Sequence, residues 1–347
     1  MKYNFDEIID CKDTNAMNTD GFSETKKGKQ NMRLGPPPPV QTALDAIGNT
    51  PVVRLRRVVP EGCADVFVKL EYFNPTGSYK DRMAKSMIEE AERRGDLKPG
   101  MTVVEASGGS TGSSLAFVCA VKGYRFLVAS SNAFALEKLR TIRGFGATVD
   151  IIHSPSGKIT ADLIPSMIRH AQEVSRGEDF YYSDQFNNRD ALIGYEEIGH
   201  ELVAQLPDGI DAFCGAIGVA GMTMGVARVM KAHWPTTRIV VLEPASSPVI
   251  TQGKPGTHHV EGIGVGFVPP LLDQNLYDDA RGIPEEEARL MCRRLACEEG
   301  LLVGTSTGLN VTAAIALAKE LGPGKTVVTV ASDTGLKYMN GNLLADG

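Results

Sequence analysis

The apolar run Thr102-Val103-Val104 is followed, after Glu105, by Ala106-Ser107-Gly108-Gly109-Ser110-Thr111-Gly112. A short run of β-branched residues is typical of a buried parallel strand, and here it leads into a turn of glycines and small residues. Two more turns of this kind follow apolar runs, at 215–221 and 304–308. In open α/β sheets, ligands bind at the carboxyl ends of strands, where such turns open into helices. The three turns therefore predict an α/β fold with a shared binding site.

Strands and helices alternate along the rest of the chain. Besides 102–104, the apolar runs that predict buried strands are 66–70, 125–129, 148–152, 212–214, 238–242 and 326–330. Between them, Asp81 to Arg94 predicts a helix with Met83, Met87 and Ala91 on one face. Pro284 to Glu299 predicts another, because acidic residues come first and Arg293 and Arg294 come later, as the helix dipole favours. Strand–helix alternation indicates parallel sheets flanked by helices.

Composition excludes several classes of protein. The chain has 347 residues, 42% of them hydrophobic and 22% charged, with a net charge of −6, so we expect a globular protein that does not bind nucleic acid. No apolar stretch reaches the roughly 18 residues of a membrane span, and residues 1–7 lack a signal pattern, so we expect a cytoplasmic protein. The 6 cysteines form no Cys-x-x-Cys pair, so buried free thiols are expected and no metal site.

The first 42 residues differ from the rest of the chain. They are polar and contain Pro36-Pro37-Pro38-Pro39, a run that favours an extended linker. We expect this extension to be partly disordered or to lie along another surface.

Exposed backbone N–H groups at strand-to-helix turns favour an anion. A single glycine-rich turn is more often only a tight connection, but three of them favour a ligand with more than one acidic group. None of the turns has the phosphate-loop ending Gly-Lys-Ser/Thr or the spaced glycines of dinucleotide binding, so a nucleotide is not the favoured ligand.

A lysine near the start of a helix adds a reactive group. It ends the segment Asn74-Pro75-Thr76-Gly77-Ser78-Tyr79-Lys80. Taken alone, Lys80 reads as an ordinary exposed lysine. The helix dipole disfavours a cation at this place and lowers its pKa, which makes the amine a better nucleophile toward an aldehyde.

In order along the chain, six segments resemble the motifs of fold-type II pyridoxal-phosphate (PLP) enzymes. The family is that of O-acetylserine sulfhydrylase (cysteine synthase) and cystathionine β-synthase. Besides the Lys80 segment, these are Gly48–Leu55, Ser107–Gly112, Gln185–Asn188, Glu261–Phe267 and Gly304–Gly308. The match covers about residues 43 to 340. It implies the tryptophan synthase β-like fold, with two domains, twisted parallel-rich sheets and PLP in the cleft between them.

The resemblance also implies roles for individual residues. Lys80 would form the Schiff base with PLP and later act as base and acid at Cα. Backbone N–H groups of Gly218, Val219, Ala220, Gly221 and Met222 would hold the phosphate. Ser306 would hydrogen-bond the pyridine nitrogen; a neutral hydroxyl there favours β-elimination and β-replacement over transamination. The substrate carboxylate would be held by Ser107, Gly108, Gly109, Thr111 and Gln185.

This chain departs from the family pattern at three places. Ser110 stands where the family has an asparagine that contacts the 3′-oxygen of PLP, so its reach is shorter. Gly108 stands where the carboxylate loop has a serine, which leaves only a backbone donor. Val219 and Met222 replace threonine hydroxyls of the phosphate loop, so either Thr223 compensates or backbone donors suffice. These changes bear on substrate choice more than on PLP binding.

The family organisation implies three parts of the chain. These are the extension 1–42, a larger phosphate-binding domain of 43–84 and 191–347, and a smaller mobile domain of 85–190 that binds the substrate carboxylate. A homodimer is expected by the same resemblance.

The main functional hypothesis is a cysteine synthase-like β-replacement on an activated serine through an aminoacrylate, with a thiol or another small nucleophile. The alternatives are a β-elimination lyase of the cysteine desulfhydrase kind and a catalytically silent PLP-fold binding protein. The sequence does not choose the leaving group or the nucleophile.

Overall fold

The computed structural model describes residues 38–157, 162–341 and 343. The predicted extension 1–42 therefore lies mostly outside the described residues. Its last residue, Thr42, caps a 3₁₀ turn, Ala43–Ala46, through a capping box in which Thr42 and Asp45 satisfy each other's backbone donors.

The larger of two sheets has six strands in the order β1-β2-β10-β7-β8-β9. β1 is antiparallel to β2 and the other neighbours are parallel. The strands are β1 (Val52–Arg54), β2 (Asp65–Leu70), β7 (Ala212–Ala216), β8 (Arg238–Pro244), β9 (Asp279–Ile283) and β10 (Thr326–Ala331).

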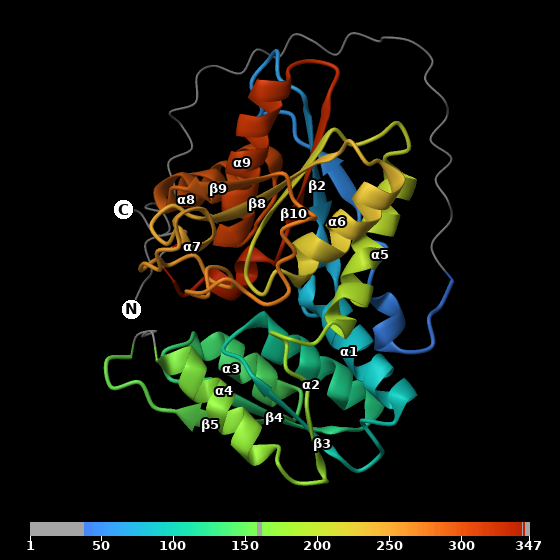
Figure 1. The fold of residues 1–347 in the computed structure, drawn as a ribbon, viewed down its shortest axis with the longest axis vertical. Coiled ribbons are helices and arrows are strands. Elements are labelled where there is room, and N and C mark those ends of the chain that lie inside the picture. Colours follow the sequence, from blue (N-terminus) through green and yellow to red (C-terminus); the bar gives the residue numbers. More distant parts are fainter. Residues whose placement is uncertain (1–37, 158–161, 342, 344–347) are drawn as a thin grey trace, which may run out of the picture.

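Helices cover both faces of this sheet (Figure 1). They are α5 (Asp190–Gln205) and α6 (Gly221–His233) on one face, and α8 (Glu285–Arg294) and α9 (Thr305–Leu321) on the other. Alternate strand residues pack in opposite directions, so Val240 and Leu242 join the core under α9 while Ile239 joins the core under α6. A short helix, α7 (Val249–Gln252), follows β8.

The smaller sheet has four parallel strands in the order β5-β4-β3-β6. Its strands are β3 (Thr102–Ala106), β4 (Arg125–Ser131), β5 (Thr148–Ile152) and β6 (Phe180–Tyr182), and its helices are α2 (Ser110–Lys122), α3 (Leu136–Gly144) and α4 (Leu163–Val174). Figure 1 shows this body in green beside the larger sheet, whose strands come from both ends of the chain. The domain boundaries at 84/85 and 190/191 stay predictions.

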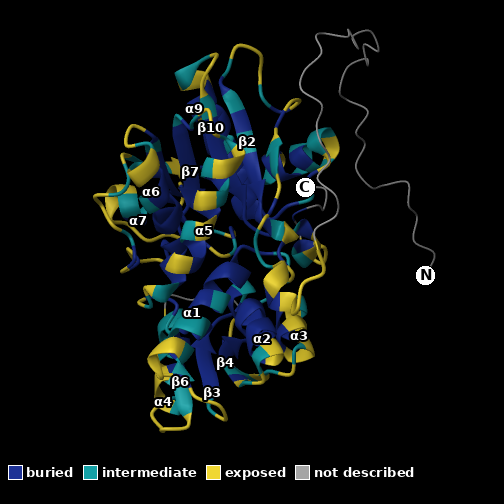
Figure 2. Ribbon diagram, turned by 90° about the vertical axis from the view of Figure 1, so that its right-hand side faces the viewer, coloured by how far each residue is buried: buried dark blue, intermediate teal, exposed yellow. Residues whose placement is uncertain are grey.

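One helix, α1 (Lys80–Arg94), packs against both bodies, and Figure 2 shows it at their junction. Met83 and Met87 are fully buried in the core of the larger sheet, whereas Ala84, Ile88 and Ala91 belong to the core of the smaller one. The sequence placed Met83, Met87 and Ala91 on one apolar face. All three are buried, but α1 has two buried faces, one for each core.

The predicted α/β fold with parallel-rich sheets is confirmed. All seven predicted strands are present, and several extend by one or two residues beyond the apolar run. The helix expected over 284–299 is α8 followed by a π-helical turn, Leu295–Glu299, which ends at Gly300 in the left-handed conformation.

Of the five described cysteines, Cys119, Cys214 and Cys292 are buried free thiols, while Cys63 is half-buried and Cys297 is exposed. Burial was thus predicted correctly for three of these five cysteines. Among the described residues, no helix has the length and apolar character needed to cross a membrane, and no group of three His, Cys, Asp or Glu side chains could hold a metal ion.

Candidate active site

The turn before α1 is anchored to the chain segment that follows β10. Tyr79 donates its backbone N–H to the Ser332 carbonyl oxygen at 3.1 Å, and Thr334 donates its backbone N–H to the Gly77 carbonyl oxygen at 3.1 Å. Within the turn, the Thr76 hydroxyl donates to the Asp81 carboxylate at 2.5 Å. These bonds fix the first residue of α1, Lys80, relative to the larger sheet.

A buried ion network holds Arg82, the third residue of α1. Its guanidinium donates to Glu71 at 2.7 and 2.8 Å and to Glu201 of α5 at 2.7 and 2.9 Å. Although burial acts to raise the pKa of Glu201, the hydrogen bonds and charges of Arg82 and Lys69 lower it to about 2. Because three segments of the chain share these bonds, the network also fixes the start of α1.

The Lys80 side chain is nearly buried, with 8% of its surface exposed. Burial lowers the pKa of Lys80 to about 8, and the charge of Glu105 opposes the shift only in part. The amine lies 5.1 Å from the centre of the Tyr79 ring and 5.9 Å from that of Tyr195. A lysine in this setting has a much larger neutral fraction near neutral pH than an exposed one, as a nucleophilic amine requires.

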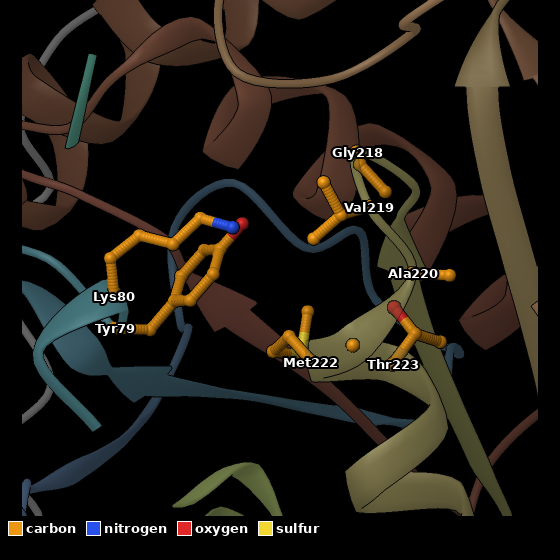
Figure 3. Close-up of a pocket in the computed structure, with 9 residues that line it drawn as sticks. Tyr79, Lys80, Gly218, Val219, Ala220, Met222 and Thr223 are labelled. Carbon is orange, nitrogen blue, oxygen red and sulfur yellow. The ribbon is translucent and has the colours of Figure 1, made fainter. Parts of the chain in front are cut away.

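Lys80 shares a pocket with the second glycine-rich turn. The pocket is lined by Tyr79, Lys80, Ala216, Gly218, Val219, Ala220, Gly221, Met222 and Thr223. Figure 3 shows Tyr79 and Lys80 on one side and the turn into α6 on the other. The structure thus brings together Lys80 and all five residues predicted to hold a phosphate.

Close backbone approach explains part of this turn. A Cβ atom on Gly218 would lie 2.5 Å from the carbonyl oxygen of Gly262, so only glycine fits there. Ala220, which precedes α6, has a φ of 67°, in the left-handed region that alanine rarely adopts. Such strain is found most often where a backbone is shaped for a ligand.

The pocket fits a phosphate. The first N–H groups of α6 have no partner within the helix and carry the positive end of its dipole. The Thr223 hydroxyl, also on the lining, is buried and has no hydrogen-bond partner among the described residues. It is the hydroxyl expected to compensate for Val219 and Met222, and a phosphate oxygen would satisfy it.

The third turn opens α9. Ser306 lies in the first turn of this helix and is 5% exposed. Two neighbouring side chains fix the helix, because the Thr307 hydroxyl accepts from the Ser332 N–H at 3.0 Å and the Asn310 amide oxygen accepts from the Ala216 N–H at 2.9 Å. The lining of the Lys80 pocket does not include Ser306 or Ser110.

The predicted carboxylate loop is braced from within. The Ser107 hydroxyl oxygen accepts from the N–H groups of Gly109 and Gly112 at 3.2 and 3.0 Å, which leaves its own proton free for a ligand. Thr111 donates its hydroxyl proton to the Gln185 amide oxygen at 2.8 Å, and Gln185 donates to the Ala106 carbonyl oxygen at 2.8 Å. The structure therefore brings Thr111 and Gln185 together, although they are 74 positions apart in the sequence.

A buried carboxylate supports this loop. Glu105 accepts from the Ser183 hydroxyl at 2.7 Å and from the N–H groups of Ala106 and Gln185 at 2.8 and 3.0 Å. Burial raises the pKa of Glu105 to about 7, against the lowering effect of these hydrogen bonds. Glu105 thus positions Gln185 and also acts on the charge of Lys80.

Comparisons with known proteins identify the family. The family described as "Pyridoxal-phosphate dependent enzyme" matches residues 43–333. The chain belongs to this family. It is 42% identical over 304 residues to a cysteine synthase of Staphylococcus aureus, which covers 87% of this chain and 96% of that protein.

Solved structures agree with this assignment. The structure of an O-ureido-L-serine synthase has a TM-score of 0.84 and 34% identity, covering 89% of this chain and 97% of that one. A hydrogen sulfide-producing enzyme from Fusobacterium nucleatum has a TM-score of 0.81 and 30% identity, covering 87% and 99%. The chain is therefore a PLP-dependent enzyme of fold type II, and the catalytically silent alternative is set aside.

Sequence reasoning missed several residues around this site. Tyr79 and Tyr195 flank the Lys80 amine, Phe134 packs onto the carboxylate loop, and Lys337 donates to the Ser110 hydroxyl at 3.3 Å. The adjacency of Tyr79 to Lys80 was a usable signal. The others are far away in sequence and lie in segments without a motif.

Proposed function

We propose that this enzyme replaces the β-substituent of O-acetyl-L-serine with sulfide, giving cysteine and acetate. The β-carbon–oxygen bond breaks, acetate leaves with its electron pair, and a carbon–sulfur bond forms at the same carbon. The observation that carries the proposal is the nearly buried amine of Lys80, with a pKa of about 8, in one pocket with the turn into α6, whose unpaired N–H groups favour an anion. The likeness to a cysteine synthase over 96% of its length supports the choice of substrate.

Bound PLP would supply an electron sink that makes the Cα proton acidic and lets the β-substituent leave. The residues that would hold its phosphate are Gly218 to Met222, with Thr223 adding the one hydroxyl of that turn. Ser306 would donate to the ring nitrogen, and Ser110 would face the 3′-oxygen. Lys80 would take the proton from Cα and return it at the end.

For the substrate carboxylate, we propose the loop Ser107–Thr111 together with Gln185. Because the Thr111 hydroxyl already donates to Gln185, the donors left for an anion are the Ser107 hydroxyl, the second amide hydrogen of Gln185 and the backbone N–H groups at the start of α2. Gly108 and Gly109 contribute backbone only. This arrangement supports binding of one small carboxylate.

A β-elimination lyase remains the second candidate. The similar Fusobacterium nucleatum protein is described as a hydrogen sulfide-producing enzyme. The same residues serve both reactions, and the difference lies in how well the site excludes water until the nucleophile adds. We also propose, from the family resemblance, a homodimer that works in the cytoplasm.

Product analysis decides between the two reactions. The holoenzyme is incubated with O-acetylserine, with and without sulfide, and cysteine, acetate, pyruvate and ammonia are measured. We expect cysteine and acetate in equal amounts, and only with sulfide. Pyruvate and ammonia as the main products would favour the lyase, and turnover by Lys80→Ala at the wild-type rate would contradict both.

A further inference from the structure

Ser110 is the first residue of α2, in the smaller of the two bodies. The neighbouring chain segment is a 3₁₀ turn, Gly335–Tyr338, that follows β10. From this turn, the Lys337 amine donates to the Ser110 hydroxyl oxygen at 3.3 Å. The two residues are 227 positions apart, so no local constraint of the chain brings them together.

Lys337 lies over the turn that presents Lys80. A Cβ atom on Gly77 would be 3.8 Å from the Lys337 Cε atom. Burial lowers the pKa of Lys337. Among the charged groups around it, Asp333 and Asp81 favour the charged ammonium form and Lys138 opposes it. Among the described residues, no carboxylate oxygen lies within ion-pair distance of the Lys337 amine, and its hydrogen-bond partner is the neutral Ser110 hydroxyl.

The direction of this hydrogen bond determines what Ser110 can do. An ammonium has three donors and no acceptor, so Ser110 must accept from Lys337. The Ser110 proton is then available to another group, and a hydroxyl that accepts from a cation is a stronger donor. The pair therefore works as one polarised donor.

We propose that Lys337 is a positioning residue that orients the Ser110 hydroxyl toward the 3′-oxygen of PLP, in place of the longer asparagine side chain of the family. This inference rests on the proposed function, because PLP supplies the acceptor. The inference explains how a serine can take the place of the asparagine: the positive charge of Lys337 makes the Ser110 hydroxyl a stronger hydrogen-bond donor. Lys337 itself needs no contact with the cofactor.

The test uses the wild-type enzyme and the variants Lys337→Met, Lys337→Arg, Ser110→Ala and the double variant Lys337→Met/Ser110→Ala. Exposed Lys319, at the end of α9, gives the matched charge control Lys319→Met. Each apoprotein is checked for its melting temperature and then titrated with PLP in the absence of any amino acid. The dissociation constant and the ratio of the long- and short-wavelength absorption bands are recorded.

A donor at the 3′-oxygen stabilises its anionic form, which absorbs at the longer wavelength. We therefore expect Lys337→Met to weaken PLP binding by roughly three- to tenfold and to move absorption toward the short-wavelength band. Ser110→Ala should do the same, and the double variant should be no worse than Ser110→Ala alone. Lys337→Arg and Lys319→Met should keep the wild-type band ratio.

Two results would overturn the inference: a wild-type spectrum in Lys337→Met, or independent, multiplying effects in the double variant. Failure of the proposed function looks different, because the wild-type protein itself would then take up no PLP. A loss of melting temperature in Lys337→Met with an unchanged band ratio would assign Lys337 a structural role and also contradict the proposal.

Discussion

The Phe134 ring occupies the space in which a side chain at residue 108 would lie. A Cβ atom built on Gly108 would be 2.2 Å from the Cδ2 and Cγ atoms of Phe134. Phe134 follows β4, is half-buried and packs on the core of the smaller sheet. Where the family has a serine that helps to hold the substrate carboxylate, this chain has a glycine covered by an aromatic ring. Gly108 and Phe134 therefore depart from the family pattern together, because the ring fits only where residue 108 has no side chain.

This relationship predicts that restoring the family residue alone is harmful. Gly108→Ser should lower the free energy of unfolding by about 1–3 kcal/mol and weaken amino-acid binding, because the new side chain displaces the Phe134 ring. In the background of Phe134→Ala the same change should cost much less. Urea unfolding of the four proteins measures the coupling. Equal costs of Gly108→Ser in both backgrounds would show that Phe134 does not restrict residue 108.

The lowered pKa of Lys80 predicts a pH dependence for cofactor uptake. Only the neutral amine attacks an aldehyde, so the rate at which the apoenzyme takes up PLP should rise with pH up to about 8 and then level off. The same shift makes the apoprotein gain stability as the pH rises from about 8 toward the ordinary lysine value of 10.5, since the unfolded chain binds the proton and the folded one does not. Stopped-flow absorbance measures the uptake.

Glu105→Gln provides the control for this pH profile. The charge of Glu105 raises the pKa of Lys80, so its removal should move the inflection to lower pH. An inflection near the ordinary lysine value in the wild type, or a shift in the opposite direction in Glu105→Gln, would be inconsistent with a buried Lys80 amine beside this carboxylate.

Gln185 is predicted to hold the carboxylate loop as well as the substrate. Gln185→Ala leaves the Thr111 hydroxyl and the Ala106 carbonyl oxygen without their partner, and both are buried. We expect a loss of about 1–3 kcal/mol in the free energy of unfolding and a higher KM for the amino acid. Exposed Gln172 on α4 gives the matched control, Gln172→Ala, with neither effect. Wild-type stability and KM in Gln185→Ala would refute the assignment.

Ion pairing between the two bodies bears on the mobility expected for the domain 85–190. Lys138 of α3, 6% exposed, pairs with Glu261 of the glycine-containing loop and lies 4.6 Å from the Tyr338 ring centre. Nearby, Asn340 donates to Glu137 at 2.7 Å. We propose that the Lys138–Glu261 pair stabilises a closed state, which the substrate carboxylate favours further. A rigid site between fixed halves is the alternative.

Lys138→Met and Glu261→Gln should each raise the KM for the amino acid roughly two- to fivefold, with no larger effect in the double variant. Small-angle scattering with and without bound amino acid should show a smaller radius on binding in the wild type. Superposable bound and free forms would support the rigid alternative, and multiplying effects would mean that the two residues act separately.

The fold could be predicted from sequence where the signal is local. Runs such as Val66–Leu70 and Arg238–Leu242 are apolar and β-branched because they are buried on both faces. The strands that were missed, β1, β6 and β9, are short or polar and lie at sheet edges, where burial does not impose a pattern. The sequence predicted one buried face for α1 instead of two, because hydrophobic periodicity shows that a residue is buried but not which core it joins.

The site residues also divide into those that a local motif predicts and those that only the fold reveals. Lys80 and the turn Gly218–Met222 stand in recognisable segments, and the structure puts them in one pocket. Phe134 and Lys337 could not be predicted, because their importance comes from contacts with Gly108 and Ser110 across the fold. Their own segments contain no repeating pattern or motif.

We expect Lys80 to bind PLP as a Schiff base. Borohydride reduction of the purified yellow holoenzyme, followed by proteolysis and mass spectrometry of the modified peptide, tests this bond. The colour should bleach, and a single reduced PLP group should be found on Lys80 and be absent from Lys80→Ala. A PLP group on another lysine, or a cofactor that leaves no covalent mark after reduction, would contradict this expectation.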